Sequence, residues 1–265
     1  MADEEKPVIL LVHGAWHNPS HLWPLTSDLQ AEGFTVLTPS LASTGFGDSI
    51  DTASHLDDAR RLTEAARPHV ERGRRVVGVA HSYGAIPLAH AMHGLTAKER
   101  AAAAAAGGPD GGEGGFTAAV FISPMPYFDT GVTALEASNG KWPGAWFFTP
   151  TDTRLELKMD AAPGAFYNDT PEPARSEATA QLGGQSTLPY RTVIERTPAG
   201  LDLPKTMVVC ADDRIFPRDL QLLTAERWGC GQTVEVPSGH TPWLRAELRP
   251  RLVEAIKEAE NGVRR

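Results

Sequence analysis

The stretch around Ser82 constrains the fold of this chain more than any other part of it. A β-branched apolar run leads directly into Ala80-His81-Ser82-Tyr83-Gly84, and a stretch compatible with a helix follows. This order predicts a buried strand, a sharp turn and a helix, with Ser82 at the apex of a nucleophile elbow. The turn requires small residues two positions before and after the serine, which Ala80 and Gly84 provide. Similar short patterns occur around buried or capping serines, so the rest of the chain has to distinguish the two interpretations.

Apolar runs that predict strands alternate along the chain with stretches that predict helices. In addition to the strand before Ser82, strands are expected at 8–12, 34–39, 118–123, 206–211 and 233–236. Apolar residues at helical spacing predict helices at 22–29, 55–70, 86–92, 217–228 and 248–256. Continuous apolar strands are typical of parallel sheets that are covered on both faces. The pattern therefore predicts an α/β fold with a doubly wound, mostly parallel six-stranded sheet and helices on both faces.

Two segments interrupt this alternation. Residues 128–203 are rich in aromatic residues, proline and glycine and are too long for a simple connection. We expect them to form a lid (cap) insertion over a core that is built from residues 1–127 and 204–265. The other segment, 101–115, begins with six consecutive alanines and continues as a glycine-rich stretch. The stretch 107–115 cannot bury apolar surface and is expected to be a flexible surface loop without an assigned function.

Three reactive side chains are expected at the same edge of the predicted sheet. Ser82 follows the third strand, Asp213 follows the fifth and His240 follows the sixth. A serine hydroxyl needs a base at neutral pH, and the histidine needs a carboxylate that fixes its tautomer and stabilises the imidazolium. Taken separately, Asp213 could be a capping or solvated acid and His240 a loop histidine. Taken together, in the order Ser, Asp, His, they predict a catalytic triad.

An acyl-transfer site also needs hydrogen-bond donors for the oxyanion. The backbone N–H of Tyr83, which follows the nucleophile, and that of Ala15, in the loop after the first strand, are the expected donors. His13 is expected to hold that loop in place. His13 and His17 are four residues apart but have no glutamate between them, so the His-Glu-x-x-His zinc motif is absent. No metal and no cofactor are predicted, since phosphate-binding motifs are also absent from the sequence.

Composition excludes several classes of partner. The formal net charge is −8, and no basic cluster is interleaved with aromatic residues, so a nucleic acid is not expected. The acidic N-terminus precedes an apolar run that is far shorter than the roughly 20 residues that span a bilayer, so neither a signal peptide nor a membrane anchor is expected. Cys210 and Cys230 form no disulfide framework. These features predict a cytoplasmic protein whose partner is a small-molecule substrate, and they leave a homodimer open.

Four motifs together resemble the α/β-hydrolase superfamily. They are Val12-His13-Gly14-Ala15-Trp16-His17, Ala80-His81-Ser82-Tyr83-Gly84, Asp213-Arg214-Ile215-Phe216-Pro217 and Gly239-His240-Thr241-Pro242-Trp243. Over roughly residues 8–258 the chain is similar to the small branch that contains plant hydroxynitrile lyases, salicylate methyl-esterases and their fungal and bacterial relatives. The resemblance implies that Asp213, which precedes Arg214, is the triad acid and that Asp212 is its neighbour. It also accounts for the short N-terminal segment, since members of this branch lack the early antiparallel strands of larger hydrolases.

The resemblance also bears on the reaction. In the lyases of this branch a lysine follows the catalytic histidine and accommodates cyanide, whereas Thr241 occupies that position here. Hydrolysis of a carboxylic ester or lactone through an acyl-enzyme is therefore the favoured function. The alternatives are a ligand receptor on an intact hydrolase scaffold and a lyase that uses the same triad. Six aromatic residues of the predicted lid could line an apolar pocket or simply pack the lid onto the core: Trp142, Trp146, Phe147, Phe148, Phe166 and Tyr167.

Overall fold

The computed structural model describes residues 5–108 and 110–261. Its central feature is a six-stranded sheet of the described residues, in which every pair of neighbouring strands is parallel. The strands are β1 (Val8–Val12), β2 (Thr35–Leu37), β4 (Arg75–His81), β5 (Gly115–Ile122), β9 (Lys205–Cys210) and β10 (Gln232–Val236). The predicted parallel α/β sheet is confirmed. Residues 1–4, 109 and 262–265, which the predicted core and surface loop include, lie outside the described residues.

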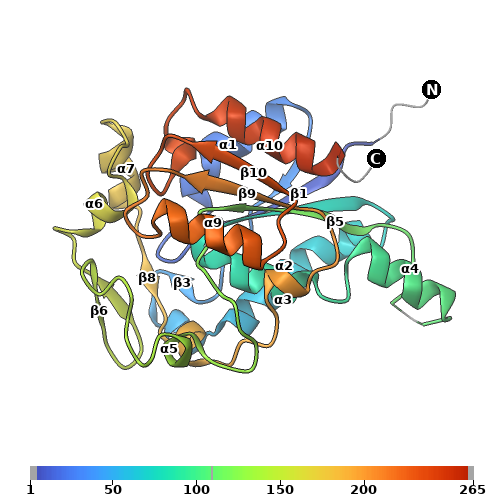
Figure 1. Cartoon of the computed structure of the whole chain (residues 1–265), viewed down its shortest axis with the longest axis horizontal. Coiled ribbons are helices and arrows are strands. Elements are labelled where there is room, and N and C mark those ends of the chain that lie inside the picture. Colours follow the sequence, from blue (N-terminus) through green and yellow to red (C-terminus); the bar gives the residue numbers. More distant parts are fainter. Residues whose placement is uncertain (1–4, 109, 262–265) are drawn as a thin grey trace.

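Helices cover both faces of the sheet because its central strands are apolar on both sides. All five residues of β1 are buried; Val8, Leu10 and Val12 belong to one apolar cluster, and Ile9 and Leu11 belong to another. The helices α2 (His55–Val70), α3 (Ala85–Met92) and α9 (Arg218–Arg227) lie on the first side, and α1 (Trp23–Ala31) and α10 (Arg249–Asn261) on the second (Figure 1). Burial of both faces explains why these strands are continuous apolar runs.

The order of the strands creates a crevice at one edge of the sheet. Across the sheet the order is β10-β9-β5-β4-β1-β2, so the direction of winding changes between β1 and β4. The loops that follow these two strands lead to opposite faces, and ligands of open α/β sheets bind in the gap between such loops. The loop after β1 contains Ala15, and the turn after β4 contains Ser82.

The segment between β5 and β9 forms a separate group of short elements beside the carboxyl edge of the sheet (Figure 1). These are α5 (Ala134–Ala137), β6 (Phe148–Pro150), β7 (Leu155–Leu157), α6 (Ala162–Phe166), α7 (Ala174–Ala180), β8 (Gly184–Gln185) and α8 (Leu188–Arg191). We refer to residues 128–203 as the insertion. β8 pairs with β3 (Thr44–Gly45), which connects the insertion to the loop after β2.

Among the helices of the described residues, none combines the length and the apolar composition that a membrane-spanning helix needs.

The structure adds regular elements to one irregular segment and refines the bounds of another. The small and glycine-rich residues 41–50 contain β3 and the start of a 3₁₀ helix, Asp48–Thr52. In the predicted surface loop, Gly115 already belongs to β5 and is buried, and the preceding alanines lie in or adjoin helix α4 (Ala97–Ala105). Thr96 caps this helix and pairs with Glu99 in a capping box, a signal that the sequence does contain.

A histidine pair between α2 and α3 predicts a loss of stability in acid. The rings of His55 and His90 lie 4.8 Å apart; His55 is fully buried and His90 is partly buried. Burial lowers the pKa of each from 6.5 to about 4. Well above pH 6.5 both rings are neutral in the folded and unfolded chain. As the pH falls from 6.5 to about 4, the unfolded chain binds protons that the folded chain excludes, so the free energy of unfolding falls.

For His55 alone, the difference in pKa corresponds to up to about 3 kcal/mol. Urea unfolding at pH 7 and at pH 4.5 measures this loss. His55→Leu removes the titrating group, so this variant should lose less stability than the wild type over the same interval. Equal losses in the two proteins would contradict the assignment of the acid sensitivity to this pair.

Candidate active site

Ser82 occupies a strained turn at the end of β4. Its φ is +54°, in the left-handed region, and the chain passes from there through a one-turn 3₁₀ helix, Ser82–Gly84, into α3. The turn packs against the loop after β1 so closely that a Cβ at Gly84 would lie 2.6 Å from the carbonyl oxygen of His13. A Cβ at Gly14 would lie 3.0 Å from the Cβ of Ser82. Glycine at both positions permits this approach, which has the geometry of a nucleophile elbow.

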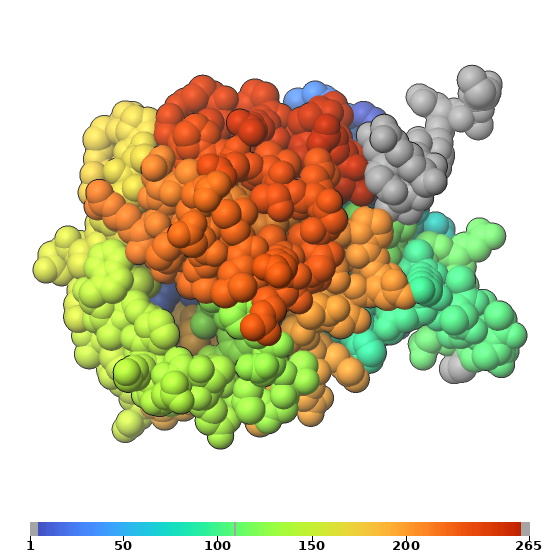
Figure 2. Space-filling view, viewed as in Figure 1, coloured from blue at the N-terminus to red at the C-terminus, as the bar shows by residue number. Residues whose placement is uncertain are grey.

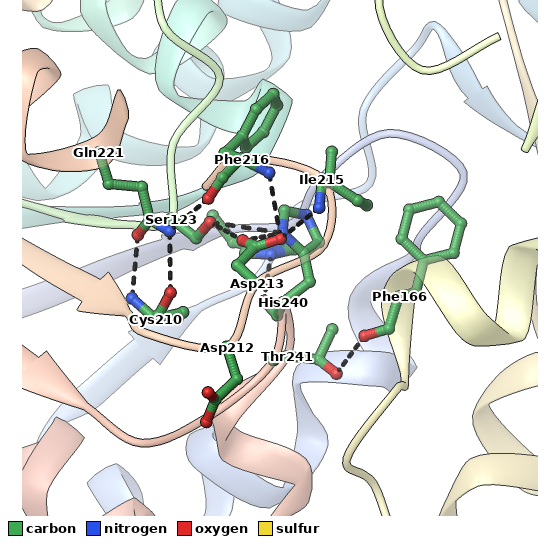
Figure 3. A network of polar contacts seen from close by, with 12 residues as sticks. Ser123, Phe166, Cys210, Asp212, Asp213, Ile215, Phe216, Gln221, His240 and Thr241 are labelled. Carbon is green, nitrogen blue, oxygen red and sulfur yellow. Dashed lines mark hydrogen bonds and ion pairs between the residues drawn. The ribbon is translucent and has the colours of Figure 1, made fainter. Parts of the chain in front are cut away.

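Asp213 and His240 form a buried hydrogen-bonded pair near this turn. His240 Nδ1 lies 2.7 Å from Asp213 Oδ2, and His240 is 1% exposed (Figure 3). The other carboxylate oxygen, Oδ1, accepts from the backbone N–H groups of Ile215 at 2.7 Å and Phe216 at 3.1 Å. The ring of His240 lies 4.5 Å from that of His81, the residue before Ser82. The structure thus gathers the three predicted triad residues at one edge of the sheet.

The charge state of Asp213 suits the role of an orienting carboxylate. Burial raises the pKa of the Asp213 carboxyl, but the charge of His240 and the hydrogen bonds that the carboxylate accepts outweigh this effect. Its pKa is therefore held below the ordinary value, and the group is ionised at neutral pH. An ionised acceptor fixes the proton of His240 on Nδ1 and leaves Nε2 free to act as a base.

The neighbouring acid, Asp212, lies outside this network. Its side chain is exposed and points away from the Asp213–His240 pair (Figure 3). Two hydrogen bonds fix its backbone, whereas its side chain takes no part in the network. Its N–H donates to the carbonyl of Ser238 at 2.9 Å, and its carbonyl accepts from the side chain of Asn168. Of the two adjacent acids, Asp213 is the one that contacts His240.

Two histidines orient the backbone of the loop after β1. The carbonyl of Gly14 accepts from His13 Nδ1 at 2.9 Å and from the backbone N–H of His17 at 3.3 Å. Because a trans peptide is planar, holding this carbonyl directs the N–H of Ala15, which belongs to the same peptide, the opposite way. The Ala15 N–H donates to no other described residue. His13 keeps this arrangement at neutral pH, since burial lowers its pKa to about 4.

The backbone N–H of Tyr83 is the second of the two predicted oxyanion donors. It lies in the first turn of the 3₁₀ helix after β4, where backbone N–H groups have no partner within the helix. Its side chain is anchored by a hydrogen bond from the hydroxyl to Asp58 Oδ2 at 2.5 Å. Asp58 also accepts from the hydroxyl and the backbone N–H of Ser43, and burial raises the pKa of its carboxyl. Ala15, Tyr83 and Ser82 line the same cavity.

This cavity has a volume of about 330 Å³ and lies between the carboxyl edge of the sheet and the insertion. Figure 2 shows a hollow between the yellow-green insertion and the orange segment of α9, with blue atoms at its bottom. The walls are mainly apolar and include four of the six predicted aromatic residues, Trp142, Phe147, Phe148 and Phe166. The other two do not line it: Trp146 is 50% exposed, and the hydroxyl of Tyr167 bonds to His17 instead.

Ser123 is a site residue that the sequence analysis missed. It lies at the end of β5, is fully buried, and donates its hydroxyl to Asp213 Oδ2, the oxygen that also contacts His240 (Figure 3). Its Oγ is 3.4 Å from His240 Nδ1. The sequence did contain a signal for Ser123, a polar residue directly after an apolar strand at the centre of the sheet. The neighbouring strand β9 ends at the same edge, and Asp213 follows it there.

The position after His240 holds no cation. The hydroxyl of Thr241 is fully buried and donates to the carbonyl of Phe166 at 3.0 Å (Figure 3). Of the two lysines of the insertion, Lys158 donates to the carbonyl of Ala145 at 2.6 Å, whereas Lys141 is exposed and lines the cavity. Within residues 5–108 and 110–261, no three His, Cys, Asp or Glu side chains are grouped so that they could hold a metal ion.

A parallel sheet with a strained serine after one strand and a buried Asp–His pair after two others defines a protein of the α/β-hydrolase class. Residues 9–253 match the model of the alpha/beta hydrolase family, and the chain belongs to this family. The resemblance that the sequence motifs indicated is thus confirmed at the level of the superfamily. The alpha/beta hydrolase nvfD of Aspergillus novofumigatus is 28% identical over 245 residues, which cover 90% of this chain and 91% of that protein.

Solved structures share the fold at low sequence identity. A pyrethroid hydrolase from Sphingobium faniae has a TM-score of 0.73 and is 21% identical, with 96% of this chain and 97% of that chain covered. Polyneuridine aldehyde esterase has a TM-score of 0.72 at 18% identity, covering 96% and 99%. The methylesterase MES16 from Arabidopsis has a TM-score of 0.69 at 19% identity, covering 95% and 99%. At these identities the likeness shows the fold, and the reaction has to be argued from the site.

Proposed function

We propose that this protein is a serine hydrolase that cleaves a carboxylic ester or lactone of a small, apolar or aromatic substrate through an acyl-enzyme. The observation that carries the proposal is the buried Asp213–His240 pair, with a 2.7 Å hydrogen bond, beside a serine at φ +54° that lines a cavity. The esterases among the structural neighbours support the same reaction class.

The chemistry divides the reaction into two acyl transfers. His240 Nε2 takes the proton of Ser82 as the hydroxyl oxygen attacks the ester carbonyl, and Asp213 stabilises the imidazolium that forms. The N–H groups of Ala15 and Tyr83 donate to the oxyanion of the tetrahedral intermediate. The C–O bond to the alcohol then breaks, and the alcohol leaves with the proton from His240. A water molecule, deprotonated by His240, attacks the acyl-enzyme in the same manner and releases the carboxylic acid and free Ser82.

The insertion acts as the cap of this site in our proposal, with residues 1–127 and 204–265 as the hydrolase core. Its aromatic side chains supply much of the cavity wall, so it determines which substrates fit. The apolar lining favours an uncharged acyl or alcohol group, since burying a charge there without a partner would be costly. One structural neighbour is named as a pyrethroid hydrolase, and we extend from it only hydrolysis as the class of reaction.

The reaction class is tested with two panels of substrates. Aryl esters, methyl esters and lactones should release acid, and mandelonitrile should release neither aldehyde nor cyanide. The reason is that departing cyanide carries negative charge in a water-poor site, whereas Thr241 offers a neutral hydroxyl that already donates to Phe166. Acid is measured by pH-stat titration, and cyanide and benzaldehyde by their absorbance assays.

The Ser82→Ala protein serves as the control in both panels. Cyanide release that depends on Ser82, without acid from any ester, would replace the hydrolase proposal with a lyase. Tight binding of an ester analogue without turnover of any substrate would favour a receptor instead.

A further inference from the structure

Several hydrogen bonds join the insertion to the loop after β1. We refer to residues 14–21 of this loop as the oxyanion loop. The indole Nε1 of Trp16 donates to the carbonyl of Leu155 at 2.7 Å, and the carbonyl of Trp16 accepts from the N–H of Gly183 at 2.8 Å. Farther along the loop, Asn18 donates to the carbonyl of Gln181 at 2.9 Å. The insertion therefore contacts this loop through fixed backbone groups as well as through its aromatic side chains.

A further contact of the insertion reaches the predicted oxyanion donor, Ala15, through His17. His17 Nδ1 lies 2.8 Å from the carbonyl oxygen of Ala15, and His17 Nε2 lies 3.0 Å from the hydroxyl of Tyr167. A carbonyl only accepts, so Nδ1 carries the proton, Nε2 is a lone-pair acceptor and Tyr167 is the donor. Burial lowers the pKa of His17 well below its usual value, so the ring stays neutral and keeps this tautomer. His17 is 1% exposed and Tyr167 is fully buried.

The backbone at this point needs such support. Trp16 lies in the left-handed region with φ +60°, a conformation that is strained for a bulky residue. Relaxation of Trp16 would rotate the peptide that joins it to Ala15, so Ala15 would be held on one side only, through the Gly14 peptide that carries its N–H. The bond from His17 to the Ala15 carbonyl opposes this rotation on one side of Ala15, as His13 does through Gly14 on the other.

We propose that Tyr167 of the insertion is a positioning residue for the oxyanion donor Ala15 and acts through His17. This inference rests on the proposed function, because it assumes that the Ala15 N–H stabilises an oxyanion. Tyr167 does not line the cavity and touches no reacting atom; it keeps His17 oriented so that the Ala15 peptide is held in place before the substrate arrives. The insertion would thus contribute to the rate as well as to the choice of substrate.

Tyr167→Phe tests the inference because it removes one oxygen and keeps the ring. Loss of a whole oxyanion donor costs about 10²- to 10³-fold in kcat, so loosening one donor should lower kcat by about tenfold. KM should stay within about twofold, since the contact forms only in the transition state. The affinity for an aryl trifluoromethyl ketone, which forms a tetrahedral adduct with the serine, should fall by the same factor as kcat/KM.

Thr170→Val is the matched control. Thr170 lies three residues farther along the insertion and is buried, and its hydroxyl has no hydrogen-bond partner in the part of the chain that the structure describes. Removing this hydroxyl should leave kcat, KM and inhibitor affinity unchanged. Wild-type kcat in Tyr167→Phe, or a tenfold loss in both variants, would overturn the inference.

A second pair of variants tests the step through His17 and does not depend on Tyr167→Phe being stable. In His17→Asn the amide nitrogen takes the place of Nδ1 and can still donate to Ala15, whereas in His17→Gln it takes the place of Nε2. His17→Asn should therefore retain about tenfold more kcat than His17→Gln, and adding Tyr167→Phe to His17→Asn should cause no further loss. Equal activity in the two variants, or an additive loss in the double variant, would contradict the coupling. Failure of the proposed function would give a different result, because turnover would then persist in Ser82→Ala. That result would overturn both proposals.

Discussion

Replacing Ser82 with alanine is expected to lower kcat for the best ester substrate by about 10⁶-fold, the loss that serine hydrolases show without their nucleophile. Alanine keeps the Cβ of Ser82, which lies so near Gly14 that a Cβ there would be 3.0 Å away, so the elbow should remain folded while the attacking oxygen is gone. Steady-state kinetics on the purified variant, with thermal unfolding as a check on the fold, measure this effect.

Ser238→Ala provides a matched control for this prediction. Ser238 is another serine near the site, on the loop that leads to His240; it is fully buried, and its hydroxyl has no hydrogen-bond partner among the described residues. Its removal should leave turnover close to that of the wild type. Retention of wild-type turnover in Ser82→Ala would exclude the acyl-enzyme mechanism.

Asp213→Asn is expected to lower kcat by about 10⁴-fold, as loss of the orienting carboxylate does in serine triads. The amide has the size of the carboxylate and can still accept from the N–H groups of Ile215 and Phe216. It no longer stabilises the imidazolium, and it can present an N–H to His240, which favours the wrong tautomer. The kinetic constants of the purified variant on the same ester measure the loss.

Asp212→Asn is the natural control, since it makes the same chemical change one residue away. The Asp212 side chain is exposed and points away from His240, so its loss should change kcat by less than about twofold (Figure 3). A large loss in Asp212→Asn with little loss in Asp213→Asn would contradict the assignment of the acid.

The core of the fold could be predicted from the sequence because its signals are local and repeated. The strand Val8–Val12 is a continuous apolar run, and the helix His55–Val70 begins with a capping box at Ser54 and places apolar residues at helical spacing. The candidate site could be predicted for a related reason. Parallel strands bring their carboxyl ends to one edge, so a serine, an acid and a histidine after three strands are expected to meet there.

The insertion could not be predicted in detail because long-range contacts determine its structure. β8 is two residues long and pairs with Thr44 and Gly45, some 140 positions earlier in the chain, so no local periodicity marks it. The same holds for Tyr167, whose partner His17 is 150 positions away. Its role depends on which residue the fold brings next to its hydroxyl, and no local sequence pattern indicates that residue.

The identity of the nucleophile is the central claim, and covalent labelling tests it most directly. The native protein is treated with a serine-directed fluorophosphonate, digested and examined by mass spectrometry, in parallel with Ser82→Ala. A nucleophile activated by His240 should displace fluoride and leave a phosphonyl group on Ser82, with loss of ester turnover in proportion to labelling. We expect a single adduct on the peptide that contains Ser82 and none in Ser82→Ala. An adduct on another residue, or no adduct in a preparation that hydrolyses esters, would contradict the account.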